Sequence, residues 1–192
     1  MSNLTVLAWR TWKNAPTDPP TDVVQAAIDA AEEAIANRCG RAFVVASAST
    51  TRVFVPTYGS SEIDIDDATA VTVVAENGAT ITSTDYQLEP VNGRDMAGNV
   101  VPYSRIRLLG SQFIPDYKGK ASVSVTATFG WAALPARYTE AVKILAADIL
   151  DAADVRNGVI GFSDYASFRV RDNGTVAMLL QRLTRSRALG MA

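Results

Sequence analysis

The sequence predicts a mixed α+β fold in which two long amphipathic helices flank a β-rich middle. Apolar residues recur with helical spacing in two segments, about 22–39 and about 135–154. Between them, from about 44 to 131, the apolar period falls to two and β-branched residues dominate. We therefore expect an α+β domain over 1–155, a helical body with a β insertion, followed by a C-terminal arm and helix over 156–192.

The first long helix is expected over about 22–39. It follows a short helical run at 4–13 and a loop rich in Pro, Thr and Asp, which carries helix-start signals. Gly40 stands where the helix would stop. The apolar stripe recurs every three or four residues and comprises Val24, Ala27, Ile28, Ala31 and Ile35.

The middle segment is expected to form short strands joined by tight turns. Asn77-Gly78 favours a two-residue type I′ hairpin turn, because both positions of that turn need positive φ. The 91–103 stretch contains several turn formers and is expected to protrude as a loop. The expected strands are 50–55, 62–66, 70–76, 79–83, 85–89, 104–109 and 121–129.

The second long helix opens at Pro135, a favoured first-turn position. Leu145 and Ile149 belong to its main apolar face, whereas Ile144, Ala147 and Leu150 lie away from that face. A helix that is apolar on more than one side is buried between layers or between subunits. We expect Leu145 and Ile149 inside the subunit and Ile144 or Leu150 covered by another element or subunit.

The C-terminal segment is the candidate partner-binding element. Residues 160–173 are expected to form an extended arm or small hairpin, and Thr175 to cap a last helix over 176–188. A helix this short is marginal alone in water, so it must dock on its own body or on a partner. The candidate binding residues combine an apolar stripe with arginines near the helix end: Val176, Leu179, Leu180, Arg182, Leu183, Arg185 and Arg187.

The composition excludes several classes of enzyme. The chain has no histidine and one cysteine, Cys39, so Ser-His-Asp and Cys-His nucleophiles, His-zinc sites and iron–sulfur clusters are excluded. No glycine fingerprint or P-loop precedes a helix. The single cysteine, with no signal peptide and no membrane-length apolar run, predicts a protein made in a reducing cytosol.

Two groups of carboxylates are candidates for a metal-binding or acid–base site. Asp64, Asp66 and Asp67 fail the EF-hand spacing, because the sixth loop position is Thr69 rather than glycine. Asp148, Asp151 and Asp154 recur along one side of the second long helix and are interpreted as solvated, with a cation of a neighbouring subunit as the alternative partner. We expect no catalytic residue, no cofactor and no metal.

Charge is unevenly placed on a chain of net charge −2. Acidic residues concentrate in 62–95 and arginines in 168–192, which suggests head-to-tail docking or charged partners, although solvated faces explain the pattern as well. Trp9, Trp12 and Trp131 are interpreted as core anchors rather than as stacking platforms for bases or sugars.

The order of several motifs resembles the head-to-tail adaptor (connector) proteins of long-tailed bacteriophages. LTVLAWRTWK, a Pro/Thr/Asp loop and IDAAEEAIANRCGRAF come first. A DYQLEP strand and ASVSVTATFGWAALPARYTEAVKILAADIL follow, so the resemblance covers roughly residues 4–155. It rests on order and spacing rather than on any single motif.

The resemblance implies a virion protein without catalytic residues. It implies a homo-oligomeric ring, twelvefold in the family, between the portal protein and the neck or tail proteins, extending the channel through which genomic DNA passes without sequence-specific binding. A portal-docking role for 156–192 is inferred from its charge and by analogy. The alternatives are another neck protein, a stopper or tail terminator, and a ligand- or carbohydrate-binding β module.

Overall fold

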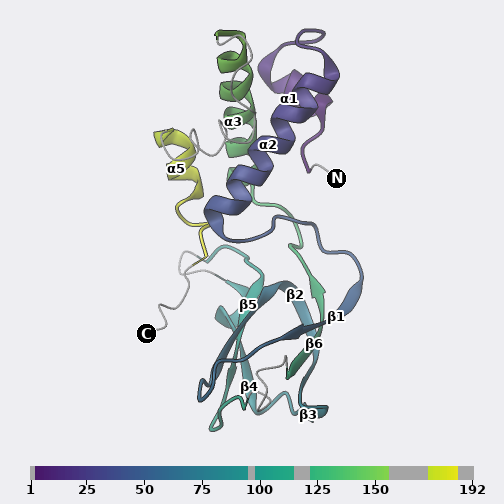
Figure 1. The fold of residues 1–192 in the computed structure, drawn as a ribbon, viewed down its shortest axis with the longest axis vertical. Helices are drawn as coiled ribbons and strands as arrows, with labels where there is room; N and C mark the ends of the chain where they lie inside the picture. The colour runs from purple at the N-terminus through teal and green to yellow at the C-terminus, as the bar shows by residue number, and fades with distance from the viewer. Residues whose placement is uncertain (1–2, 95–97, 115–121, 156–172, 186–192) are drawn as a thin grey trace. The chain divides into compact units, whose positions relative to one another are not determined.

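The computed structural model describes residues 3–94, 98–114, 122–155 and 173–185 (Figure 1). The chain divides into two compact units, one formed by Met1–Arg41 with Leu134–Ala192 and the other by Ala42–Ala133. The α-helices belong to the first unit and the strands to the second, so the predicted mixed α+β class is confirmed. No helix in the described ranges is long and apolar enough to cross a membrane.

The first unit begins with α1 (Val6–Lys13) and α2 (Thr21–Cys39). The predicted stop at Gly40 is confirmed, because its φ is 64° and its N–H bonds back to the last turn of α2. The buried Arg10 guanidinium holds the intervening loop by donating to the carbonyls of Ala15 at 3.3 Å and Pro19 at 2.6 Å. One long side chain thereby fixes the entry into α2.

Helix α3 (Ala136–Val155) packs against α2 and α5 (Gly174–Leu180). Leu145 and Ile149 are buried, as predicted, and so are Ala147 and Leu150 on other sides of the helix. The interpretation of α3 as a helix between layers is therefore confirmed within this unit.

The start and end of the last helix differ from the prediction. Asn173, not Thr175, is the N-cap, and its Oδ1 accepts from Val176 N at 3.0 Å. The helix ends at Leu180 instead of 188, and a turn follows in which Leu183 N and Thr184 N both donate to the Leu180 carbonyl. Asn173 has the extended backbone of an N-cap, whereas Thr175 already lies inside the helix, and Asn ranks above Thr as a cap. The expected arm at 160–173, apart from Asn173, and residues 186–188 lie outside the described residues.

The second unit is an antiparallel sheet in the order β1-β6-β2-β5-β4, with β3 also paired to β2. A 3₁₀ turn, η1 (Val91–Gly93), follows β4. The strands are β1 (Ser49–Phe54), β2 (Glu62–Glu76), β3 (Ala79–Ile81), β4 (Tyr86–Glu89), β5 (Tyr103–Leu108) and β6 (Val123–Phe129).

The expected strands 62–66 and 70–76 are one strand, β2. Its register shifts between Asp64 and Ala68 and again between Val71 and Val73. These irregularities interrupt the alternation of inward- and outward-facing residues along the strand. The sequence pattern of one bent strand therefore resembles that of two. The first half of β2 pairs with β5 and the second half with β6 and β3.

The predicted turn at Asn77-Gly78 is confirmed, since both residues have positive φ (50° and 85°) and join β2 to β3. The sheet curls around its own apolar core. That core comprises Ile63, Ile65, Ala68, Val74, Ile106, Leu108, Phe113, Val123, Val125, Ala127 and Phe129.

Candidate functional site: partner-binding surfaces

The carboxylates weighed as metal ligands are ion-paired on the sheet. Asp64 accepts from Arg105 Nε at 2.9 Å, and Asp66 from Arg52 Nη1 at 2.6 Å, whereas Asp67 is buried. Within the described part of the chain, no three His, Cys, Asp or Glu side chains cluster closely enough to hold a metal ion. Asp64 and Asp66 are therefore held in ion pairs with arginines of β5 and β1.

These ion pairs extend into a charged ladder across β2, β5 and β4. Glu62 accepts from Arg105 at 3.0 Å and Arg107 at 2.6 Å, and Arg107 also reaches Glu89 at 3.1 Å. Burial favours the neutral form of Arg105, but hydrogen bonding to Asp64 and the charges of Asp64, Glu62 and Glu89 outweigh it and raise the pKa of Arg105. Most of the charge in the ladder is paired internally, since both arginines meet its carboxylates, and little is left for an external partner.

The C-terminal candidate residues divide into two groups. Val176, Leu180 and Leu183 are buried, and α5 packs against α3 of its own unit. Leu179 is half-buried, whereas Arg182 and the neighbouring Met178 are exposed. The apolar stripe therefore anchors the helix to its own body, and the other side of α5 is open to a partner.

Arg185 ties this segment to the end of α2. Its main-chain N–H donates to the Cys39 carbonyl at 2.9 Å, and Arg41 Nη1 donates to the Leu183 carbonyl at 3.3 Å. Burial raises the pKa of the Cys39 thiol, although a hydrogen bond with Thr184 partly opposes the shift. Arg187, the last candidate residue, lies outside the described residues.

Two of the three aspartates along α3 bind within the subunit. Asp148 accepts from Asn173 Nδ2 at 2.6 Å, which links α3 to the cap of α5. Asp151 is exposed and pairs with Lys13 at 3.3 Å. The Asp154 side chain lies outside the described part of the structure. The cation that meets Asp151 thus comes from the same chain rather than from a neighbour.

The tryptophans differ in exposure. Trp9 is buried and donates from Nε1 to the Lys143 carbonyl at 3.2 Å. Trp131 is also buried, and its ring stacks on Phe43 with centroids 5.5 Å apart. The core-anchor interpretation is confirmed for these two, whereas Trp12 is 39% exposed and donates to Glu140 at 3.1 Å.

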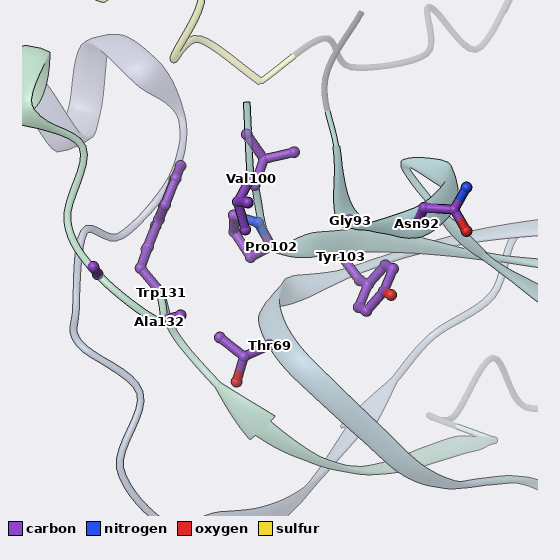
Figure 2. Close-up of a pocket in the computed structure, with 10 residues that line it drawn as sticks. Thr69, Asn92, Gly93, Val100, Pro102, Tyr103, Trp131 and Ala132 are labelled. Atoms are coloured by element: carbon purple, nitrogen blue, oxygen red, sulfur yellow. The ribbon is translucent and has the colours of Figure 1, made fainter. Parts of the chain in front are cut away.

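A pocket of about 260 Å³ opens in the β unit beside Trp131 (Figure 2). Its lining includes Thr69, Asn92, Pro102, Tyr103 and Trp131. No acidic or basic side chain lines it in the described structure. Such a pocket suits an apolar side chain or a small uncharged group and offers no acid–base pair for catalysis.

The Phe129-Gly130-Trp131 motif needs glycine at its centre for a structural reason that the sequence does not reveal. Gly130 has φ 119°, and its N–H donates to the Asp67 carbonyl at 2.7 Å. The chain at Val44–Ala46 passes so closely that a Cβ on Gly130 would lie 2.6 Å from the Val44 carbonyl oxygen. Trp131 N then donates to that same oxygen, and Ala46 N donates to the Trp131 carbonyl. The motif therefore fastens the segment that precedes β1.

Comparison with solved structures finds this fold in phage-like particles. A chain in the neck of an empty gene transfer agent (GTA) particle, computed with C6 symmetry, is 21% identical, with TM-score 0.58 over 97% of this chain and 92% of that chain. This chain shares the fold of GTA neck chains. A chain in the native GTA neck, computed with C12 symmetry, is 21% identical, with TM-score 0.51 over 87% of this chain and 84% of that chain.

A chain in the virion of the native GTA particle is 20% identical, with TM-score 0.51 over 90% of this chain and 81% of that chain. No protein-family model matches the sequence, and no curated protein matches it either.

Proposed function

We propose that this protein is a structural component of the neck of a tailed phage or phage-like particle, and within the neck the head-to-tail adaptor. In this role it forms a ring between the portal and the neck or tail proteins, twelvefold as in the family it resembles. The ring lengthens the channel for genomic DNA. The work is mechanical and electrostatic and needs no catalytic residue, cofactor or metal.

The observation that carries the proposal is the fold likeness to a neck chain over 97% of this chain. A likeness of that extent includes both the helical unit and the β unit, so it is not the chance sharing of one common motif. The motif order of residues 4–155 supports the same role, because it is a property of the sequence alone.

The open side of the C-terminal segment supports portal docking. Met178 on α5 and Arg182 in the turn after it are exposed, while the buried Val176, Leu180 and Leu183 hold the segment on its own body. An arginine near a helix end suits an acidic protein surface, and a flanking methionine suits adaptable apolar contact. Of the seven candidate residues, we propose Leu179, Arg182, Arg185 and Arg187 as the ones that face the portal.

Binding to purified portal tests the adaptor role. We expect Arg182→Glu to weaken portal binding at least tenfold, whereas Arg52→Glu, a charge reversal on the β unit, leaves it unchanged. Equal binding by both variants would contradict docking through α5. Salt dependence alone does not decide, because an acidic protein surface and DNA phosphate both give salt-sensitive binding.

The stopper and the tail terminator are distinguished by the same assay. An adaptor binds the portal directly, whereas either rival binds only after an adaptor is in place. If the wild-type chain does not bind portal alone but binds a portal–adaptor complex, it is a stopper or a tail terminator and not an adaptor.

A further inference from the structure

Exposed valines of the β unit gather along one edge of its sheet. The edge segment, residues 44–55, contains β1 and the extended chain before it. At least half of the surface of each of four valines in it is exposed: Val44, Val45, Val53 and Val55. Isolated exposed valines are ordinary, but here one exposed pair precedes β1 and a second pair lies at its end, on a single edge of the sheet.

The edge segment is held in an extended form along one side only. Its Ser49–Phe54 part pairs with β6 in unbroken register, and among the described residues no second strand pairs with β1. Upstream, Val45 bridges Trp131 and Ala46 N donates to the Trp131 carbonyl at 2.8 Å, in the close passage against Gly130. The other side of the segment therefore presents an ordered row of main-chain groups.

β1 carries few of the usual protections of an edge strand, and its single charge, on Arg52, is already paired with Asp66. Natural edges are blunted by lysine, proline, a bulge or an inward-pointing charge. β1 reads STTRVF, with neither lysine nor proline, and its pairing with β6 contains no register shift. An exposed, regularly paired edge strand of this kind, with Val53 at its end, is a template for another strand.

The edge segment also lacks a free charge. Residues 42–61 contain one charged residue, Arg52. Its guanidinium is 2.6 Å from Asp66 and lies over the Phe129 ring, 4.2 Å from the centroid. Depletion of charge with retained apolar surface is the composition of the centre of a protein interface.

We propose that the edge segment binds a neighbouring copy of this chain, which adds an extended segment to β1. The inference rests on the proposed ring and names the surface that joins its subunits. The GTA necks that share this fold were computed with C6 and C12 symmetry, which places copies side by side around an axis. Identical copies carry the same net charge of −2, so they meet most favourably where that charge is absent.

A charged partner fits this edge less well than a copy does. DNA phosphate or an acidic portal surface gains from arginines, and the sequence concentrates those in 168–192, where Arg182 is exposed, rather than along residues 44–55. An edge strand gives affinity through main-chain hydrogen bonds and apolar side chains, which a second copy can supply without charge complementarity.

Sedimentation velocity across a concentration series tests the inference. We expect the wild-type chain to self-associate, weakly in isolation, at concentrations up to about 1 mM. Val53→Lys should weaken this association at least tenfold. Leu109→Lys places the same charge at an exposed position on the same unit and should leave association unchanged. Thermal unfolding of both variants confirms that neither has lost its fold.

Each outcome bears on the proposal. A chain that stays monomeric throughout, or equal association by the two variants, would overturn it. A Val53→Lys chain that still forms rings but no longer binds portal would assign the edge to the portal instead. If the chain self-associates through Val53 but is not found in a neck, the inference about the edge segment would hold and the proposed function would be wrong.

Hydrogen exchange gives an independent readout on the assembled neck. Roughly half of the amides of β1 point away from β6 and are expected to exchange rapidly in the monomer. They should become protected in the ring if a strand adds to them. A ring in which these amides stay unprotected would contradict strand addition while leaving the neck role intact.

Discussion

The Arg185 amide donates a hydrogen bond to the Cys39 carbonyl at 2.9 Å, joining the last described turn to the end of α2. Thr184 contributes a further hydrogen bond to the Cys39 side chain. The segment 173–185 is thus folded onto its own unit while part of its surface stays open. Packing on the subunit uses one side of this short helix, and the proposed docking to a partner would use the other.

Removing residues 173–192 should expose Cys39. The thiol is buried in the intact chain, and its raised pKa further lowers the thiolate fraction at neutral pH, so Ellman's reagent should react slowly. We expect the truncated chain to react at least tenfold faster under native conditions. Circular dichroism before reaction confirms that the remaining helices persist. An unchanged rate would mean that other parts of the chain shield the thiol.

The apolar anchors of α5 should matter for stability more than its exposed side does. Leu180 is 2% exposed, so Leu180→Ala should lower the free energy of unfolding by about 2–5 kcal/mol in urea titration. Met178 is 69% exposed on the same helix, and Met178→Ala should change it by less than about 0.5 kcal/mol. Similar losses for the two variants would contradict the packing of α5 on its own unit.

Gly130 is expected to tolerate substitution poorly. Gly130→Ala places a Cβ against the main chain of Val44 and Ala46 at a φ that L side chains rarely adopt. Gly110→Ala has the same kind of backbone strain with open space around the Cβ. We expect Gly130→Ala to cost about 1–3 kcal/mol more than Gly110→Ala in unfolding titrations. Equal costs would show that the 44–46 segment moves aside freely.

Tyr138 should make the protein less stable in alkali. Burial, aided by the Glu32 carboxylate, raises the pKa of Tyr138, so the folded state keeps a proton that the unfolded state loses above about pH 10. The free energy of unfolding therefore falls as pH rises past that value. Tyr138→Phe should flatten this fall, whereas Tyr58→Phe, at an 84% exposed position, should not. A wild-type fall that Tyr138→Phe leaves unchanged would assign the effect to other groups.

Local signals in the sequence predicted local structure well. The helix stop at Gly40 and the turn at Asn77-Gly78 are predicted correctly, because both depend on the φ preferences of a few neighbouring residues. The buried sides of α3 followed from apolar spacing alone.

Features set by distant neighbours were not predictable in the same way. The irregular pairing that makes β2 one strand depends on β5 and β6, and the close passage at Gly130 depends on residues more than eighty positions earlier. The edge segment was missed because β-branched residues look the same in a central strand and at an edge. Its one sequence signal is the near absence of charge over 42–61.

The most direct test of the neck role is to locate a tagged copy of the chain in assembled particles by electron microscopy. We expect the label at the head–tail junction, in a ring between the capsid vertex and the tail, with filled heads and separate tails accumulating when the chain is absent. A label elsewhere on the particle, or normal joined particles that contain none of this chain, would contradict the neck role.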